Sequence, residues 1–264
     1  MKLVCYCADD FAMNAEITHA ILHLLHQKVI QATSCMTQSP YWFDHATKLL
    51  DIQQPFNIGL HLNFTHNFND EDYIYSLNTC IRKAWSHTLS RHHIRQSIEK
   101  QWGNFIEATG KQPDFIDGHQ HVHQFPVIRE ILISFLKEKK FKGWIRSLNQ
   151  PLYIQGYQLK TYILHTLGAR KLQSLCTTHH IPTNAYFAGI YNFSTTVDYA
   201  FLNQKWLKHA QENTLIMCHP SLTTTQLEDP IYLARINEYN YLSSPQFLED
   251  CHRFNVQLAP IGAI

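Results

Sequence analysis

The sequence lacks several features that would assign it to a common class of protein. No run of about 18 or more apolar residues occurs, so we predict no transmembrane helix. The first ten residues contain one lysine and two aspartates, which is not the layout of a signal peptide. The formal net charge of the 264 residues is only +1, which provides no excess positive charge for binding nucleic acid or an anionic membrane. We therefore expect neither kind of partner.

Disulfide spacing, nucleotide-binding loops and linkers are missing as well. The seven cysteines are odd in number and show no disulfide-framework spacing, so we expect reduced thiols and a cytoplasmic protein. No glycine-rich phosphate loop follows the first apolar segment, which argues against a Rossmann or P-loop nucleotide site. No low-complexity segment, internal repeat or Gly/Ser-rich linker divides the chain, so residues 1–264 are predicted to form a single domain.

Hydrophobic residues make up 45% of the chain and follow alternating strand and helix patterns. Three- and four-residue spacing predicts helices over 17–25, 94–105 and 127–136. Strand-like segments are 2–7, 29–36, 56–64, 114–117, 144–148, 185–191, 214–218 and 256–261. Strands that alternate with helices indicate βα units and a parallel sheet. This number of units in one chain favours a TIM-like (β/α) barrel over an open doubly wound sheet.

Polar residues at the ends of predicted strands are the candidates for a site, because catalytic residues of such barrels project from the carboxyl ends of strands. Asp9 and Asp10 follow the first apolar run. His61 lies on the polar face of its strand beside a glycine that leaves room for a ligand, with a satisfied core histidine as the alternative. His219 is either a turn histidine or a catalytic one. Arg146 is either a substrate-binding residue or half of a structural ion pair.

The segment "DFIDGHQHVHQFP" has the strongest functional pattern. Asp117, His119, His121 and His123 alternate, so an extended chain would direct all four side chains one way. Several buried imidazoles need partners or a metal. Aspartate and histidine suit Zn²⁺, or Mg²⁺ if waters complete the coordination. With two adjacent acids near the start of the chain, one would bind the metal while its neighbour takes a proton from the attacking water.

The polar segment 66–90 contains Tyr73, Tyr75 and Trp85 and is expected to form an active-site loop. Its aromatic rings would either stack on a sugar or form an apolar lid.

Four motifs together resemble the YdjC-like family of carbohydrate deacetylases, which includes chitooligosaccharide deacetylases and hopanoid-associated members. They are "ADDF" with Asn14, "GLHLNFT", "DGHQHVHQFP" and "CHP", in the family's order and spacing. The segment 231–247 also resembles the family's C-terminal Arg–Glu helix, through Arg235 and Glu238. The resemblance covers nearly the whole chain.

This resemblance implies a distorted (β/α) barrel related to the NodB-like polysaccharide deacetylases. It implies that Asp10, His61 and His119 hold a divalent metal cation, with Asp9 as the catalytic base and His219 as the general acid. The substrate would be an N-acetylated amino sugar such as a chitooligosaccharide. Mg²⁺ and Zn²⁺ both remain open, and so does formation of a homo-oligomer.

Two positions depart from the family pattern, which usually has glycine at both. Ala12 would narrow the pocket with its methyl group, and Ser221 would alter a turn. One alternative function is a metal-dependent hydrolase of another bond, such as a phosphate ester, and a second is a metal- or glycan-binding protein without turnover. A Cys–His hydrolase using Cys218 is disfavoured, because adjacent strand residues point to opposite faces.

Overall fold

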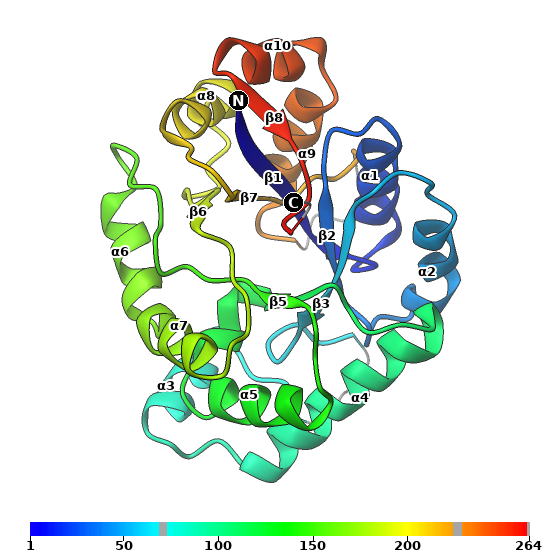
Figure 1. Cartoon of the computed structure of the whole chain (residues 1–264), viewed down its shortest axis with the longest axis vertical. Helices are drawn as coiled ribbons and strands as arrows, with labels where there is room; N and C mark the ends of the chain where they lie inside the picture. Colours follow the sequence, from blue (N-terminus) through cyan, green and yellow to red (C-terminus); the bar gives the residue numbers. More distant parts are fainter. Residues whose placement is uncertain (69–72, 224–228, 263–264) are drawn as a thin grey trace.

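Within the described residues, eight parallel strands form a curled sheet at the centre of the computed structural model, with helices around it (Figure 1). The structure describes residues 1–68, 73–223 and 229–262. The order across the sheet is β5-β4-β3-β2-β1-β7-β6, and β8 pairs with the start of β1. Each strand overlaps one of the segments predicted from the sequence. The strands are β1 (Lys2–Phe11), β2 (Ala32–Cys35), β3 (Asn57–Leu62), β4 (Phe115–Gly118), β5 (Trp144–Ile145), β6 (Tyr186–Ala188), β7 (Thr214–Cys218) and β8 (Val256–Leu258).

The two edges of the sheet, β5 and β6, are linked by isolated bridges. Ile145 bridges Thr183, and Pro151 bridges Phe187. The backbone N–H of Ile145 donates to Pro182 O at 2.9 Å, so this edge donor is satisfied without a regular ladder. The predicted (β/α) barrel is therefore confirmed in a distorted form, in which β5 and β6 share no continuous pairing within the described residues.

The helices surround the sheet and cover its outer face (Figure 1). They are α1 (Ala15–His26), α2 (Trp42–Leu50), α3 (Leu77–Trp85), α4 (Arg91–Thr109), α5 (Ile128–Glu138), α6 (Gln158–Thr166), α7 (Ala169–Thr178), α8 (Tyr199–His209), α9 (Tyr232–Leu242) and α10 (Pro245–Arg253), with a 3₁₀ segment η1 (His119–Gln124). The helices predicted over 17–25, 94–105 and 127–136 are confirmed as α1, α4 and α5. In the described part of the chain, no helix combines the length and the apolar character that a membrane span requires.

Alternate residues of the strands face two separate cores. In β1, Val4 and Tyr6 belong to the large core between the sheet and the helices, whereas Cys5 belongs to a smaller core. Phe115 and Trp144 also lie in this smaller core and stack with ring centroids 4.4 Å apart. The barrel interior is therefore filled by side chains, and a pocket lies at the end where the strands finish.

Gly59 of β3 makes room for Phe115 rather than for a ligand, which corrects the sequence interpretation. A Cβ atom at position 59 would lie 2.4 Å from the nearest atom of the Phe115 ring. The absence of a side chain is therefore a packing requirement of the barrel interior.

Gly59→Ala should destabilise the protein by roughly 1–3 kcal/mol, because a buried methyl group without space forces the Phe115–Trp144 stack to move. Gly103→Ala is the matched control: Gly103 lies within α4, and its added Cβ would have nothing within 4 Å. We expect that control to stabilise the protein by about 0.5–1 kcal/mol. Urea unfolding of both variants measures the difference, and equal midpoints would contradict this account.

Candidate active site

A β-bulge near the end of β1 directs Asp9 and Asp10 toward the same pocket. Ala8 pairs with Thr33 and Phe11 with Cys35, so β1 has one residue more than β2 over this interval. Asp10 takes a φ of 68° inside the bulge. In a regular strand two successive side chains would point to opposite faces, but here both carboxylates line one cavity.

Asp10, His61 and His119 come together from β1, β3 and the start of η1. Asp10 Oδ1 lies 3.2 Å from His61 Nε2 and 2.9 Å from His119 Nδ1. One ligand atom from each residue lies within 4.8 Å of the others, a spacing that three ligands of one metal ion can adopt. One carboxylate oxygen and two imidazole nitrogens are a donor set for a borderline divalent cation, with coordination positions left open.

The second nitrogen of His61 is held by neighbours in the barrel. His61 Nδ1 lies 2.6 Å from Asp117 Oδ1 and 2.9 Å from Ser34 Oγ. Burial opposes protonation of His61, but the charge of Asp117 and the hydrogen bonds to Asp10 and Asp117 outweigh it and raise its pKa to about 10. The surroundings of His61 therefore favour positive charge, from a proton or from a bound cation. A carboxylate behind a ligating histidine is also the usual way to fix its ring orientation.

Arg146 lies beneath the pocket, where it binds Asp9 and Asp117. Its Nη1 donates to Asp9 Oδ2 at 2.6 Å and its Nη2 to Asp9 Oδ1 at 2.5 Å. The same Nη2 lies 2.6 Å from Asp117 Oδ2. Cys7, Asp9 and Asp117 form a second group with metal-ligand spacing, but this guanidinium already supplies the positive charge there. Arg146 has 0% exposure, so its side chain cannot contact a substrate directly. It forms a structural ion pair, which was the alternative to a substrate-binding role.

Arg235 of α9 neutralises Asp10 from the opposite side. Its Nη2 donates to Asp10 Oδ2 at 2.7 Å, and its Nε donates to Asp229 Oδ2 at 2.6 Å. Burial opposes ionisation of Asp10, but Arg235 and His119 outweigh it and hold the pKa of Asp10 well below its usual range. Asp10 therefore remains an anion, with Oδ1 directed to the two histidines.

His219 follows β7 and faces Asp9, with its Nε2 3.8 Å from Asp9 Oδ2. Its backbone N–H donates to Glu238 Oε2 at 2.5 Å, and the Tyr191 hydroxyl donates to Glu238 Oε1 at 2.6 Å. Burial lowers the pKa of His219 to about 4. The ring is therefore neutral near pH 7, and a general acid at this position would have to gain its proton during the reaction.

A pocket of about 1170 Å³ is lined by Asp9, Asp10, His61, His119, His219 and Arg235, among others. Its wall includes Tyr191 and Phe193 after β6, and Lys160 of α6, which sequence reasoning missed. Lys160 Nζ donates to Tyr191 O at 2.5 Å and lies 4.8 Å from the centre of the Phe193 ring. The rule that strand ends carry the site would have identified Tyr191, because the predicted strand 185–191 ends there.

Ala12 and Ser221 do not narrow this pocket, and neither lines it. Ala12 has a φ of 69°, in the left-handed region that favours glycine, and its methyl group is buried in the large core. Ser221 is 2% exposed, and its backbone N–H donates to Arg235 O at 3.2 Å. The departure at Ala12 is therefore a matter of backbone conformation rather than of pocket size.

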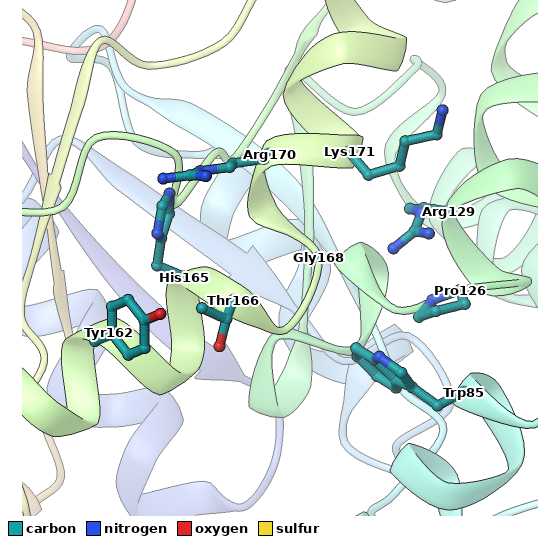
Figure 2. Close-up of a pocket in the computed structure, with 9 residues that line it drawn as sticks. All are labelled: Trp85, Pro126, Arg129, Tyr162, His165, Thr166, Gly168, Arg170 and Lys171. Carbon is teal, nitrogen blue, oxygen red and sulfur yellow. The ribbon is translucent and has the colours of Figure 1, made fainter.

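Tyr73, Tyr75 and Trp85 of segment 66–90 lie outside this pocket, and part of the segment is not a loop because α3 occupies Leu77–Trp85. Residues 69–72 lie outside the described residues. Tyr73 stacks on His93 with ring centroids 3.6 Å apart, and Tyr75 packs against the large core. Trp85 lines a different pocket, beside Pro126 and Arg129 (Figure 2). The expected sugar-stacking role of these three rings is thus not supported by their positions.

The alternation predicted for Asp117, His119, His121 and His123 stops at Gly118, where β4 ends. The chain turns into η1, so the four side chains do not point one way. His123 is fully buried, and its Nε2 lies 3.0 Å from Arg146 O. His121 lines the pocket but is not part of the Asp10–His61–His119 cluster.

Fold and site together define an α/β-barrel protein with a candidate metal site at the carboxyl ends of its strands. The chain belongs to the YdjC-like protein family, whose model matches residues 3–253. A chitooligosaccharide deacetylase of Yersinia pestis bv. Antiqua (strain Angola) is 27% identical over 256 residues, which cover 92% of each chain. A relative of the same name in Yersinia pseudotuberculosis serotype O:3 (strain YPIII) has the same identity and coverage.

Solved structures show the same fold at low sequence identity. A protein of Enterococcus faecalis V583, to which cellobiose-phosphate cleavage is attributed, has a TM-score of 0.71 and 19% identity, covering 98% of this chain and 97% of its own. A polysaccharide deacetylase of Bacillus cereus has a TM-score of 0.51 and 11% identity, covering 100% of this chain and 93% of its own. The expected relation to polysaccharide deacetylases is therefore confirmed at the level of fold.

His61→Ala and His119→Ala should each weaken binding of Zn²⁺ by at least about 100-fold, because each removes one of three converging donors. His66→Ala is the control, since His66 lines the same pocket, with its ring 6.0 Å from that of His119, but lies outside the donor cluster. Isothermal titration calorimetry on the three variants measures the affinities. Wild-type affinity in either donor variant would remove that residue from the ligand set.

Proposed function

We propose that this protein is a metal-dependent deacetylase that hydrolyses the N-acetyl group of an amino sugar such as a chitooligosaccharide, with residues 1–264 acting as one domain. The observation that carries the proposal is the convergence of Asp10, His61 and His119 beside a separate Asp9–His219 pair in one pocket. The names of the Yersinia relatives support the same reaction.

Asp10, His61 and His119 would hold the cation, Mg²⁺ or Zn²⁺, through Asp10 Oδ1 and one nitrogen of each histidine. When bound, such a cation polarises the acetyl carbonyl and lowers the pKa of the attacking water. Arg235 keeps Asp10 ionised, and Asp117 fixes the ring of His61. Both neighbours therefore prepare the donors before substrate arrives.

Asp9 would take the proton of the attacking water. The two hydrogen bonds from Arg146 hold its carboxylate in one orientation, with Oδ2 directed toward His219. His219, neutral at rest, would receive this proton across the 3.8 Å that separates it from Asp9 Oδ2, through a small side-chain movement or one bridging water. The protonated ring then donates to the departing amine, which leaves poorly as an anion. Glu238 accepts a hydrogen bond from the backbone N–H of His219 and so positions His219 during both steps.

The test of the proposed function is acetate release from N,N′-diacetylchitobiose by the purified protein, before and after treatment with a chelator. We expect turnover that is lost with the chelator and restored by Zn²⁺ or Mg²⁺, since the site presents three donors to a cation. A panel of phosphate esters assayed in parallel distinguishes hydrolysis of another bond. Binding of the disaccharide without release of acetate would instead identify a glycan-binding protein.

Asp9→Asn and Asp10→Asn should separate the roles of the two adjacent acids. Asp10→Asn should weaken metal binding, because it removes the one anionic donor of the cluster. Asp9→Asn should keep the metal and lose on the order of 100- to 10,000-fold in turnover, the usual range for a positioned general base. Elemental analysis and acetate release are measured on the same samples. Near-normal turnover of metal-loaded Asp9→Asn would refute the base assignment, whereas loss of its metal would make Asp9 a ligand.

His219→Ala should keep the metal but slow hydrolysis of the amide by about 100-fold or more. An O-acetyl ester of the same sugar has a leaving group that needs less protonation, so its hydrolysis should fall much less. The ratio of the two rates is the measurement, and an equal loss on both substrates would argue against His219 as the general acid.

A further inference from the structure

The backbone directly after His119 has an unusual conformation. Gln120 has φ 52° and ψ 26°, and His121 has φ 59° and ψ 26°. Both are left-handed conformations, which disfavour residues that carry a side chain. Two such residues in succession persist only where the surrounding structure stabilises them, and strained backbone of this kind clusters at functional sites.

This turn presents three consecutive side chains to the pocket. His119, Gln120 and His121 all line it, whereas an extended chain would direct only alternate side chains there. The left-handed backbone therefore adds two polar side chains, those of Gln120 and His121, to the pocket wall next to one metal ligand.

Neither added side chain is a metal-site donor or is hydrogen-bonded within the described residues. The donor cluster takes only His119 from this turn. No hydrogen bond joins the side chain of Gln120 or His121 to another group in residues 1–68, 73–223 and 229–262, and His121 Nδ1 is buried without a partner. His121 is 7% exposed and held edge-on against Phe187, with ring centroids 5.8 Å apart. By contrast, His123 in the same segment is used structurally, through Arg146 O.

We propose that Gln120 and His121 are specificity-determining residues that hydrogen-bond the sugar. An amide and an imidazole each offer a donor and an acceptor, as do the hydroxyl and acetamido groups of a neutral N-acetylated amino sugar. Gln120 is exposed at the mouth of the pocket and His121 lies deeper, so together they contact the substrate on the side of His119. This inference rests on the proposed function, since it names contacts to the same substrate.

The test exploits the backbone strain, using Gln120→Gly and a matched control, Lys140→Gly. Glycine adopts left-handed backbone freely, so both variants relieve a positive φ, which is 52° at Gln120 and 51° at Lys140. Lys140 is exposed at the end of α5 and does not line the pocket. The melting temperature should stay level or rise by roughly 2–4 °C in both. Only Gln120→Gly should raise KM for N,N′-diacetylchitobiose, by about 10-fold for one lost polar contact, with kcat within about twofold.

His121→Asn is the second variant, because asparagine tolerates left-handed backbone but is too short to make the same contact. It too should raise KM about 10-fold while zinc affinity stays at the wild-type value. Unchanged KM in both variants of an active protein would overturn this inference and leave the proposed function standing. A fall in melting temperature of Gln120→Gly without a change in KM would show a structural role and overturn it as well. Wild-type protein that neither binds nor deacetylates the disaccharide would overturn both.

Discussion

Neutralisation of buried carboxylates is the constraint on which the rest of this structure depends. Asp9, Asp10 and Asp117 are at most 2% exposed, and an uncompensated charge at such depth costs several kcal/mol. Arg146, after β5, and Arg235, from α9, supply the compensation. The site can therefore exist only when segments that lie more than 200 residues apart, β1 and α9, have docked on the same end of the barrel.

The two arginines also differentiate two chemically identical neighbours. Arg146 donates to both oxygens of Asp9, and Oδ2 also faces His219. This arrangement suits a group that transfers a proton. Arg235 engages one oxygen of Asp10 and leaves the other to two imidazoles, which suits a ligand. The pKa of buried Glu238 shifts in the opposite direction to that of Asp10. Burial raises the pKa of Glu238 to about 7, although Arg235 lies nearby. Local charge geometry, more than residue type, decides the role of each acid.

Two departures from regular backbone each place adjacent polar residues at the pocket. The bulge in β1 turns Asp9 and Asp10 to one side, and the left-handed turn after β4 does the same for Gln120 and His121. Both departures break the alternation that a strand imposes, at the carboxyl ends where a parallel barrel is open. The regular parts of β1 and β4 meanwhile fill the interior, through contacts such as Phe115 on Trp144.

The sequence by itself determined the eight parallel strands found in the described residues, because strands buried on both faces leave short apolar runs between amphipathic helices. It also brought Asp9, Asp10, His61 and His219 to one pocket, since strand ends meet at one end of a barrel. Only the tertiary structure decided that Arg146 is buried beneath the site, that Gly59 accommodates Phe115, and that Tyr191 rather than Tyr73 lines the wall. Those outcomes depend on partners distant in the chain, and periodicity carries no information about which distant side chain will pack against a given residue.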